Sequence, residues 1–258
     1  MMSIIILCYN APDYERKCIE SVLRHTTVPY ELILVNNNGT PESKAVCKEY
    51  STRSGIIYVE LLENKSVANG WNRGISYTNK NYPYIAILNN DLILTKDWDK
   101  LLLAPLQKDA KVAMTGPTLS YCATSQRDPI AYRDRQKMKV QDIDAFAEKY
   151  AHLYLGKEYP MRDLSGCCFI LSRESLNAVG LFDEEFLIGS GEEAEWEFRA
   201  RKKGYTLVWV QSCYVHHYGH VSFSERERLE PSLKSEAVWR KNAELYQKKI
   251  KEAKNNGM

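Results

Sequence analysis

The sequence predicts an α/β protein with a Rossmann-like, mostly parallel central sheet flanked by helices. Three short apolar segments, residues 3–8, 31–35 and 56–61, alternate with segments of helical periodicity. Such alternation is typical of parallel sheets, in which each helix carries the chain back to the start of the next strand. The 258 residues are sufficient to bury one large core without cross-links.

The first strand is expected to end at the turn Tyr9–Pro12, because asparagine and proline favour turns. A helix is expected from Asp13, as N-cap, to His25. The polar run Asn36–Gly39 ends the second strand in the same way. The following elements are expected in order: a helix over 40–50, a strand over 56–61, a helix over 67–78, a strand over 84–88 and a helix over 98–106.

The periodicity weakens between residues 121 and 163, which we expect to form an excursion or flap over the site and to include a helix over 142–155. The elements expected after it are a strand over 166–171, a helix over 173–179 closed by Gly180, a helix over 191–203 and a strand over 206–211. The sequence thus predicts one domain over 1–223 and a charged, helical C-terminal extension over 224–258.

The composition excludes several classes of protein. With 35 Lys+Arg against 33 Asp+Glu, the net charge of +2 provides no field of the kind that nucleic-acid-binding proteins carry. No apolar run reaches 18 residues, so a cytoplasmic location is expected. Basic residues in 127–139 and in the tail fit either peripheral contact with the inner membrane face or a solvated helix surface. The seven cysteines are expected to be reduced core residues.

Two groups of residues have the chemistry of metal ligands. Asn89, Asn90 and Asp91 follow a predicted strand, and amide and carboxylate oxygens there suit Mg²⁺ or Mn²⁺, although an ordinary polar turn has the same composition. His216, His217 and His220 lie just after another predicted strand. Imidazole binds divalent ions, but buried or surface histidines without a metal are more common.

Gly191–Glu195 places three carboxylates at a predicted helix start. Helix starts favour acidic residues in general, whereas crowding and desolvation would raise a carboxylate pKa and produce a general base. The Gly-rich motifs of NAD enzymes and P-loop ATPases and the Gly-x-Ser-x-Gly motif of α/β-hydrolases do not occur.

Several motifs follow one another in a known order: SIIILCYN (3–10), LVNNNGT (34–40), NKSVANGWNRG (64–74), ILNND (87–91), SGCCFILSRE (165–174), GLFDEEF (180–186), GEE (191–193) and HYGHVSF (217–223). Together they resemble glycosyltransferase family 2, a group of inverting, metal-dependent enzymes with the GT-A fold that use nucleotide sugars. The resemblance covers roughly residues 3–223.

The resemblance implies specific roles. Asp91 and His217 would hold a divalent ion, Mn²⁺ or Mg²⁺, and Glu193, with Glu192 beside it, would be the general base. Asn36, Asn89 and Glu193 depart from the family pattern, which has acidic residues at the first two positions and aspartate at the third. The residues implied in nucleotide-sugar binding are Cys8, Tyr9, Asn10, Asn36, Asn64, Asn72, Asn89 and Asn90.

The implied function is transfer of a hexosyl or deoxyhexosyl group from a UDP- or dTDP-type donor to a hydroxyl of a glycan, lipid-linked or protein acceptor, as in polysaccharide biosynthesis. A retaining transferase remains an alternative. A sugar nucleotidyltransferase is disfavoured because Tyr9–Pro12 contains no glycine. A catalytically weak or inactive GT-A protein that binds nucleotide or carbohydrate is the third alternative.

Overall fold

The computed structural model describes residues 1–134, 137–187, 189–219, 221–229 and 235–255. Its first half is a parallel sheet in the order β3-β2-β1-β4. The strands and the helices that connect them alternate as expected: β1 (Met2–Cys8), α1 (Pro12–His25), β2 (Tyr30–Asn36), α2 (Pro41–Tyr50), β3 (Ile56–Glu60), α3 (Val67–Tyr77) and β4 (Tyr84–Asn89). The carboxyl ends of these four strands meet at one edge of the sheet.

The second half of the sheet is mixed. Strand β8 runs antiparallel to both β4 and β6, whereas β6 and β9 are parallel. Two short strands, β5 and β7, pair antiparallel with β9. The elements of this half are β5 (Leu92–Ile93), α4 (Trp98–Lys108), β6 (Val112–Leu119), α5 (Pro129–Asp134), α6 (Val140–Leu153), β7 (Glu158–Met161), β8 (Cys168–Ser172), α7 (Arg173–Val179), α8 (Glu192–Lys202), β9 (Thr206–His217), α9 (Val221–Leu229) and α10 (Ser235–Asn255).

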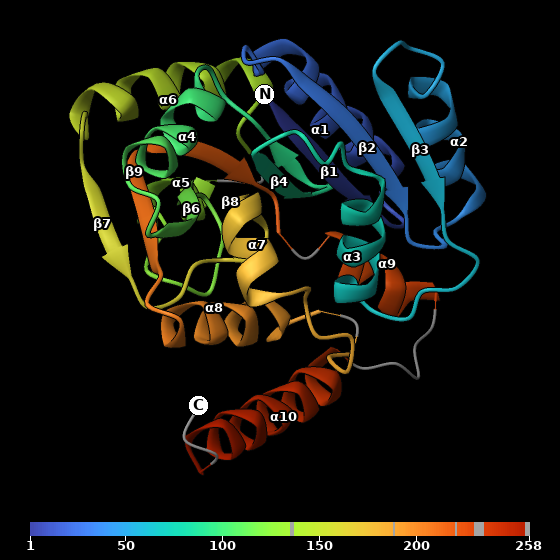
Figure 1. The fold of residues 1–258 in the computed structure, drawn as a ribbon. Coiled ribbons are helices and arrows are strands. Elements are labelled where there is room, and N and C mark those ends of the chain that lie inside the picture. Colours follow the sequence, from blue (N-terminus) through green and yellow to red (C-terminus); the bar gives the residue numbers. More distant parts are fainter. Residues whose placement is uncertain (135–136, 188, 220, 230–234, 256–258) are drawn as a thin grey trace.

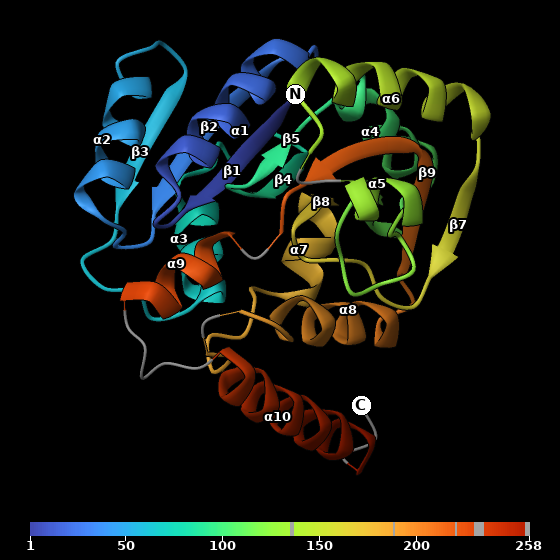
Figure 2. The same cartoon turned by 180° about the vertical axis from the view of Figure 1, so that it is seen from behind.

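Side-chain alternation along β1 divides the core between the two faces of the sheet. Ile4 and Ile6 pack with α1, α2 and α4, whereas Ile5 and Leu7 pack with α3, α7 and α8. Figures 1 and 2 show this sheet between its helical layers. Helix α3 approaches β1 so closely that a Cβ atom at Gly74 would lie only 2.6 Å from Ile5 Cγ2. Glycine in α3 therefore allows the helix to reach the strand ends where the site lies.

Two of the differences from the predicted boundaries concern α1 and β9. Helix α1 begins at Pro12, with Ala11 at the N-cap, so the prediction that Asp13 caps this helix was wrong. Proline fits the first helical turn, where its missing N–H has no partner to lose. Strand β9 continues to His217 because its last residues pair with Leu92 and Ile93. His216 and His217 therefore lie within a strand rather than after it.

The segment 121–163 extends along β9. Its helix α6 contributes Ile143, Ala147 and Tyr150 to a small core around Tyr214 of β9. Figures 1 and 2 show α6 at the opposite end of the molecule from α8 and α10. Two residues at the start of the segment, Tyr121 and Ala123, line the pocket described below. Helix α6 therefore packs away from the pocket.

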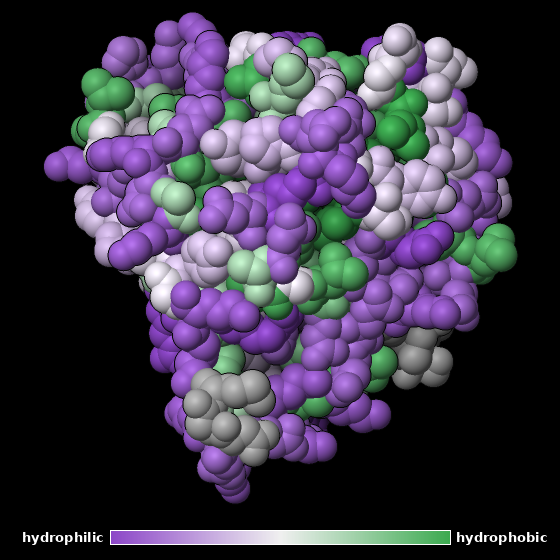
Figure 3. Space-filling model, in the orientation of Figure 1, coloured by the Kyte–Doolittle hydropathy of each residue, from purple (hydrophilic) through white to green (hydrophobic). Residues whose placement is uncertain are grey.

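The cysteines are buried and reduced, as expected, and the face in Figure 3 has few hydrophobic residues. All seven cysteines lie within the described residues, are buried and form no disulfide. The face in Figure 3 is mainly hydrophilic, with hydrophobic residues in small separate patches. None of the helices in the described ranges is long and apolar enough to cross a membrane.

Candidate active site

Asp91 and His217 form a buried pair just beyond the end of β4. His217 Nε2 lies 3.1 Å from Asp91 Oδ1, and the Gly219 N–H donates to Asp91 Oδ2 at 3.1 Å. Burial opposes ionisation of Asp91, but the charge of His217 and the hydrogen bonds from His217 and Gly219 hold its pKa below the ordinary value. Burial likewise disfavours the His217 imidazolium, but Cys167 and Asp91 raise the pKa of His217 well above its ordinary value.

The geometry of this pair fits a divalent ion. Two ligands at right angles on an ion with bonds of about 2.1 Å lie about 3 Å apart, close to the separation observed between Asp91 Oδ1 and His217 Nε2. His217 Nδ1 lies 2.7 Å from the Tyr121 carbonyl oxygen. Donation from Nδ1 to this carbonyl leaves Nε2 as the nitrogen that would bind a metal, which would displace the Nε2 proton. His216 instead contacts the Tyr214 hydroxyl through Nδ1, and His220 lies outside the described residues.

Most of the asparagines expected at the nucleotide site bind other parts of the protein. Asn36 is fully buried, accepts from the Gly39 N–H and donates to Ser43 Oγ, so it shapes the turn after β2. Asn72 holds the backbone of Phe182 through both amide atoms. The other engaged side chains are Asn10, which accepts from Thr40 N–H, Asn64, which accepts from Asn37, and Asn90, which donates to the Tyr9 carbonyl and to Glu15.

Asn37 was not predicted as a site residue but has an available acceptor. Its Nδ2 donates to Asn64 Oδ1 and to the Ser66 carbonyl, while its buried Oδ1 has no hydrogen-bond partner in the described part of the chain. A buried polar atom without a partner is costly unless a ligand or water satisfies it. The polar run after β2 was visible in the sequence, but the unsatisfied atom appears only in three dimensions.

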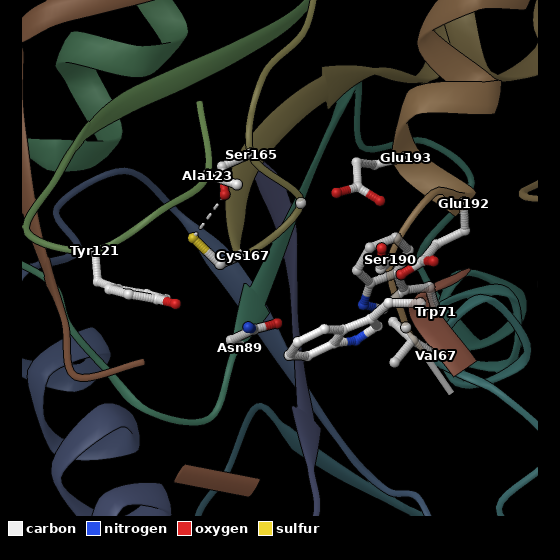
Figure 4. Close-up of a pocket in the computed structure, with 13 residues that line it drawn as sticks. Val67, Trp71, Asn89, Tyr121, Ala123, Ser165, Cys167, Ser190, Glu192 and Glu193 are labelled. Carbon is white, nitrogen blue, oxygen red and sulfur yellow. Dashed lines mark hydrogen bonds between the residues drawn. The ribbon is translucent and has the colours of Figure 1, made fainter. Parts of the chain in front are cut away.

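A pocket of about 440 Å³ opens between α3, the segment before β8 and the start of α8. In Figure 4, Glu192 and Glu193 project from one side of it and Tyr121 lies on the opposite side, with Asn89 and Trp71 between them. The buried Trp71 Nε1 has no hydrogen-bond partner among the described residues. The lining residues are Val67, Trp71, Asn89, Tyr121, Ala123, Ser165, Gly166, Cys167, Gly189, Ser190, Glu192, Glu193 and Trp239.

Glu192 and Glu193 are crowded together at the first turn of α8. Burial, followed by the charge of Glu193, raises the pKa of Glu192 to about 8, and Glu192 Oε2 is buried without a hydrogen-bond partner within the described ranges. Burial also raises the pKa of Glu193, although backbone N–H groups partly oppose this effect. The Gly191 N–H, for example, donates to Glu193 Oε2 at 3.2 Å. Both carboxylates thus have the raised pKa that a general base requires near neutral pH.

Gly166 makes room for the Glu193 carboxylate. A Cβ atom at this position would lie 2.9 Å from Glu193 Cδ. Cys167, the next residue, also lines the pocket and contributes to the raised pKa of His217. Cys167 stands in an apolar run, which predicts an ordinary core residue. The structure therefore adds Gly166 and Cys167 to the site.

One group of potential metal ligands within the described residues lies elsewhere. Cys8 Sγ, Cys47 Sγ and a Glu15 carboxylate oxygen all lie within 4.8 Å of one another. All three residues are fully buried, and the Glu15 Oε1 atom already accepts from Ser43 and Asn90. Burial raises the pKa of Glu15, which favours its neutral form. This group therefore fits a packed, uncharged part of the core better than a metal site.

Comparison of the sequence with known proteins shows several related glycosyltransferases. The profile of glycosyl transferase family 2 matches residues 3–180. The hyaluronan synthase of Pasteurella multocida is 22% identical over 238 residues, which are 84% of this chain and 24% of that protein. The glycosyltransferase GlyG of Streptococcus pneumoniae serotype 4 is 30% identical over 116 residues, 44% of this chain and 38% of that protein. The chain thus spans less than two fifths of the length of these relatives.

Solved structures show the same fold. The crystal structure of GalNAc-T7 with UDP, GalNAc and Mn²⁺ has a TM-score of 0.64 and 17% identity, covering 84% of this chain and 43% of that one. The mannosyltransferase PcManGT of Pyrobaculum calidifontis, in complex with GDP-Man and Mn²⁺, has a TM-score of 0.62 and 14% identity, covering 88% and 60%. Both are GT-A glycosyltransferases, so the fold class expected from the sequence is confirmed. The family profile covers more than half of this chain, so the chain belongs to glycosyl transferase family 2.

Proposed function

We propose that this chain transfers a hexosyl or deoxyhexosyl group from a nucleoside-diphosphate sugar to an acceptor hydroxyl, with inversion at the anomeric carbon. The observation that carries the proposal is the pocket in which Glu192 and Glu193 lie opposite Tyr121. Tyr121 connects the pocket to the buried Asp91–His217 pair, because its carbonyl oxygen accepts a hydrogen bond from His217 Nδ1. A base in the pocket and a metal-binding pair behind its opposite wall are the parts that a single displacement needs.

Asp91 and His217 would hold a divalent ion, and the structures of GalNAc-T7 and PcManGT, both with Mn²⁺, support this assignment. The imidazole ligand favours Mn²⁺ over Mg²⁺, which prefers oxygen. When bound, the ion would neutralise charge on the leaving nucleoside diphosphate. In the protein itself, Tyr121 orients His217, and the Gly219 N–H orients Asp91.

Glu193 is the proposed general base. Its carboxylate accepts the proton of the acceptor hydroxyl as that oxygen attacks the anomeric carbon from the face opposite the leaving diphosphate. The bond between the anomeric carbon and the diphosphate oxygen breaks as the new glycosidic bond forms, so no covalent intermediate is required. The Gly191 N–H and the space left by Gly166 fix the position of this carboxylate.

The unpartnered polar atoms support a UDP- or dTDP-type donor. Uracil and thymine both present an imide N–H, which the Asn37 Oδ1 atom can accept. Trp71 Nε1 can donate to a diphosphate or sugar oxygen in the pocket.

The acceptor is proposed to be a glycan, a lipid-linked glycan or a protein. Polysaccharide synthesis is favoured by the similarity to hyaluronan synthase and to the poly-β-1,6-N-acetyl-D-glucosamine synthase of Staphylococcus aureus. Cytoplasmic location and peripheral membrane contact through basic segments stay predictions.

The proposal is tested with a panel of nucleoside diphosphates, measured as shifts of the thermal midpoint with and without Mn²⁺. A ligand at about 100 times its Kd adds roughly 2.7 kcal/mol, which shifts the midpoint by several degrees for a chain of this size. A Mn²⁺-dependent shift with UDP or dTDP, followed by turnover of the matching sugar and inversion of the product by NMR, would support it. A retained anomer would overturn the inverting mechanism, and no shift with any nucleotide would favour an inactive GT-A protein.

The pH dependence of turnover should distinguish the two carboxylates. Because a base acts in its ionised form and burial raises the pKa of Glu193, turnover at saturating Mn²⁺ is expected to rise with pH. The acid limb should lie above the ordinary glutamate pKa, because burial raises the pKa of Glu193. Burial and the Glu193 charge raise the pKa of Glu192 to about 8. The limb should remain in Glu192→Gln. A limb centred near pH 8 that disappears in Glu192→Gln would assign the base to Glu192.

A further inference from the structure

The backbone immediately before the two carboxylates is strained. Gly189, Ser190 and Gly191 have φ values of +90°, +88° and +106°. Glycine adopts such values readily, but Ser190 has a side chain, and a residue of this kind persists there only when its surroundings hold it. Ser190 and Gly189 also line the pocket. The position of Glu192 and Glu193 therefore depends on whatever holds this strained backbone in place.

A single side chain from the C-terminal helix binds this backbone. Asn242 of α10 is 2% exposed. Its Oδ1 accepts from the Leu187 N–H at 3.1 Å, and its Nδ2 donates toward the carbonyl oxygens of Leu187, Gly189 and Ser190 at 2.7, 3.1 and 2.9 Å. Four backbone groups of one short segment thus converge on one amide, which matches them in both donor and acceptor character.

Helix α10 is also bound to the same region through Lys249, two turns after Asn242. Lys249 Nζ lies 2.6 Å from Asp183 Oδ2 and 3.0 Å from Glu185 Oε2, both on the segment that leads to Gly189. Figures 1 and 2 both show α10 beside α8. Trp239, three residues before Asn242 and therefore on the same side of the helix, lines the pocket. Helix α10 thus contributes Trp239 to the pocket lining and binds two further lining residues, Gly189 and Ser190, through Asn242.

We infer that α10 is part of the catalytic centre and that Asn242 is a positioning residue, which holds the strained backbone before α8 so that Glu193 faces the acceptor. The inference rests on the proposed role of Glu193 as base. The family profile ends at residue 180, so α10 lies beyond the matched region. In this inference Asn242 acts through the backbone groups of Leu187, Gly189 and Ser190, and it is given no contact of its own with donor or acceptor.

The test compares Asn242→Ala and Asn242→Asp with the unaltered chain. Asn242→Asp keeps the side-chain size and the acceptor for the Leu187 N–H, but it places a carboxylate against three carbonyl oxygens. We expect both variants to accelerate hydrogen–deuterium exchange in peptides spanning 186–195 by on the order of tenfold or more, because buried backbone groups lose their partner. Turnover, kcat, should fall on the order of tenfold, with UDP binding in Mn²⁺ changed less than twofold.

The matched control is Asn255→Asp, which makes the same chemical change at an exposed position of α10. It should leave both exchange and kcat unchanged. A residue that only stabilises the fold would lower the thermal midpoint without changing kcat below that midpoint, and this result would overturn the inference. Unchanged exchange over 186–195 in Asn242→Ala would overturn it as well. Exchange is measured without substrate, so failure of the inference is distinguishable from failure of the proposed transferase activity.

Discussion

Replacing Glu193 by glutamine is expected to lower sugar transfer about 10²–10⁴-fold, the usual contribution of a positioned general base. Glutamine has nearly the same shape and keeps an oxygen that can accept from the Gly191 N–H, so the backbone at the start of α8 should stay in place. It cannot accept a proton from an acceptor hydroxyl. Turnover is measured as release of nucleoside diphosphate from the donor identified by the nucleotide panel.

Nucleotide binding should separate this effect from a general loss of structure. Glu193 is proposed to act on the acceptor, so the Mn²⁺-dependent midpoint shift with UDP should be the same in Glu193→Gln as in the unaltered chain. Glu148→Gln, an exposed change on α6, is the matched control and should alter neither quantity. A larger loss of turnover in Glu192→Gln than in Glu193→Gln would reverse the two roles. If Glu192→Gln and Glu193→Gln both turn over as fast as the control Glu148→Gln, a carboxylate base at α8 is excluded.

The first half of the fold could be predicted because its strands are short, continuous and β-branched. Ile4 to Leu7 are buried on both faces of the sheet, and such strands stand out against amphipathic helices. Strand β6 was missed because Gly116 and Pro117 within it are typical of turns. Its pairing with β9 along most of its length outweighs those local preferences. The antiparallel direction of β8 depends on how the chain crosses the sheet, which local periodicity does not encode.

The candidate site was predicted in part, through family resemblance more than through spacing. Asp91 and His217 come together because His217, the last residue of β9, pairs with Leu92 of β5, which directly follows Asp91. Strand β5 is only two residues long. No local pattern marks a strand that short. Hydrogen bonds within the protein determine which asparagines could bind a ligand. Asn36 was expected to bind the nucleotide, but its side chain is hydrogen-bonded to Gly39 and Ser43. Asn37 Oδ1 has no hydrogen-bond partner among the described residues. Asn242 carried no sequence signal, since it stands in a charged helix far from every motif.

Replacing Asp91 by asparagine is expected to abolish the Mn²⁺-dependent midpoint shift with UDP and to lower transfer on the order of 10³-fold or more. The ion is proposed to hold the diphosphate and to stabilise its charge as it leaves, a contribution worth several kcal/mol. Asparagine keeps an acceptor for the Gly219 N–H but provides no charge for the ion. Binding and turnover should therefore fall together in Asp91→Asn, whereas Glu193→Gln should affect turnover alone.

The buried contact with His217 makes a folding control necessary for this variant. Asp91 raises the pKa of His217, and without its charge burial favours the neutral imidazole, which can still lie beside an asparagine amide. The metal-free midpoint of Asp91→Asn should therefore show a folded protein, and Asp109→Asn at an exposed position is the matched control. A folded Asp91→Asn that binds UDP in Mn²⁺ as tightly as the unaltered chain would remove Asp91 from the metal site. Other groups of the pocket would then bind the diphosphate. Trp71 would be the first residue to mutate, because its Nε1 is a buried donor without a partner among the described residues.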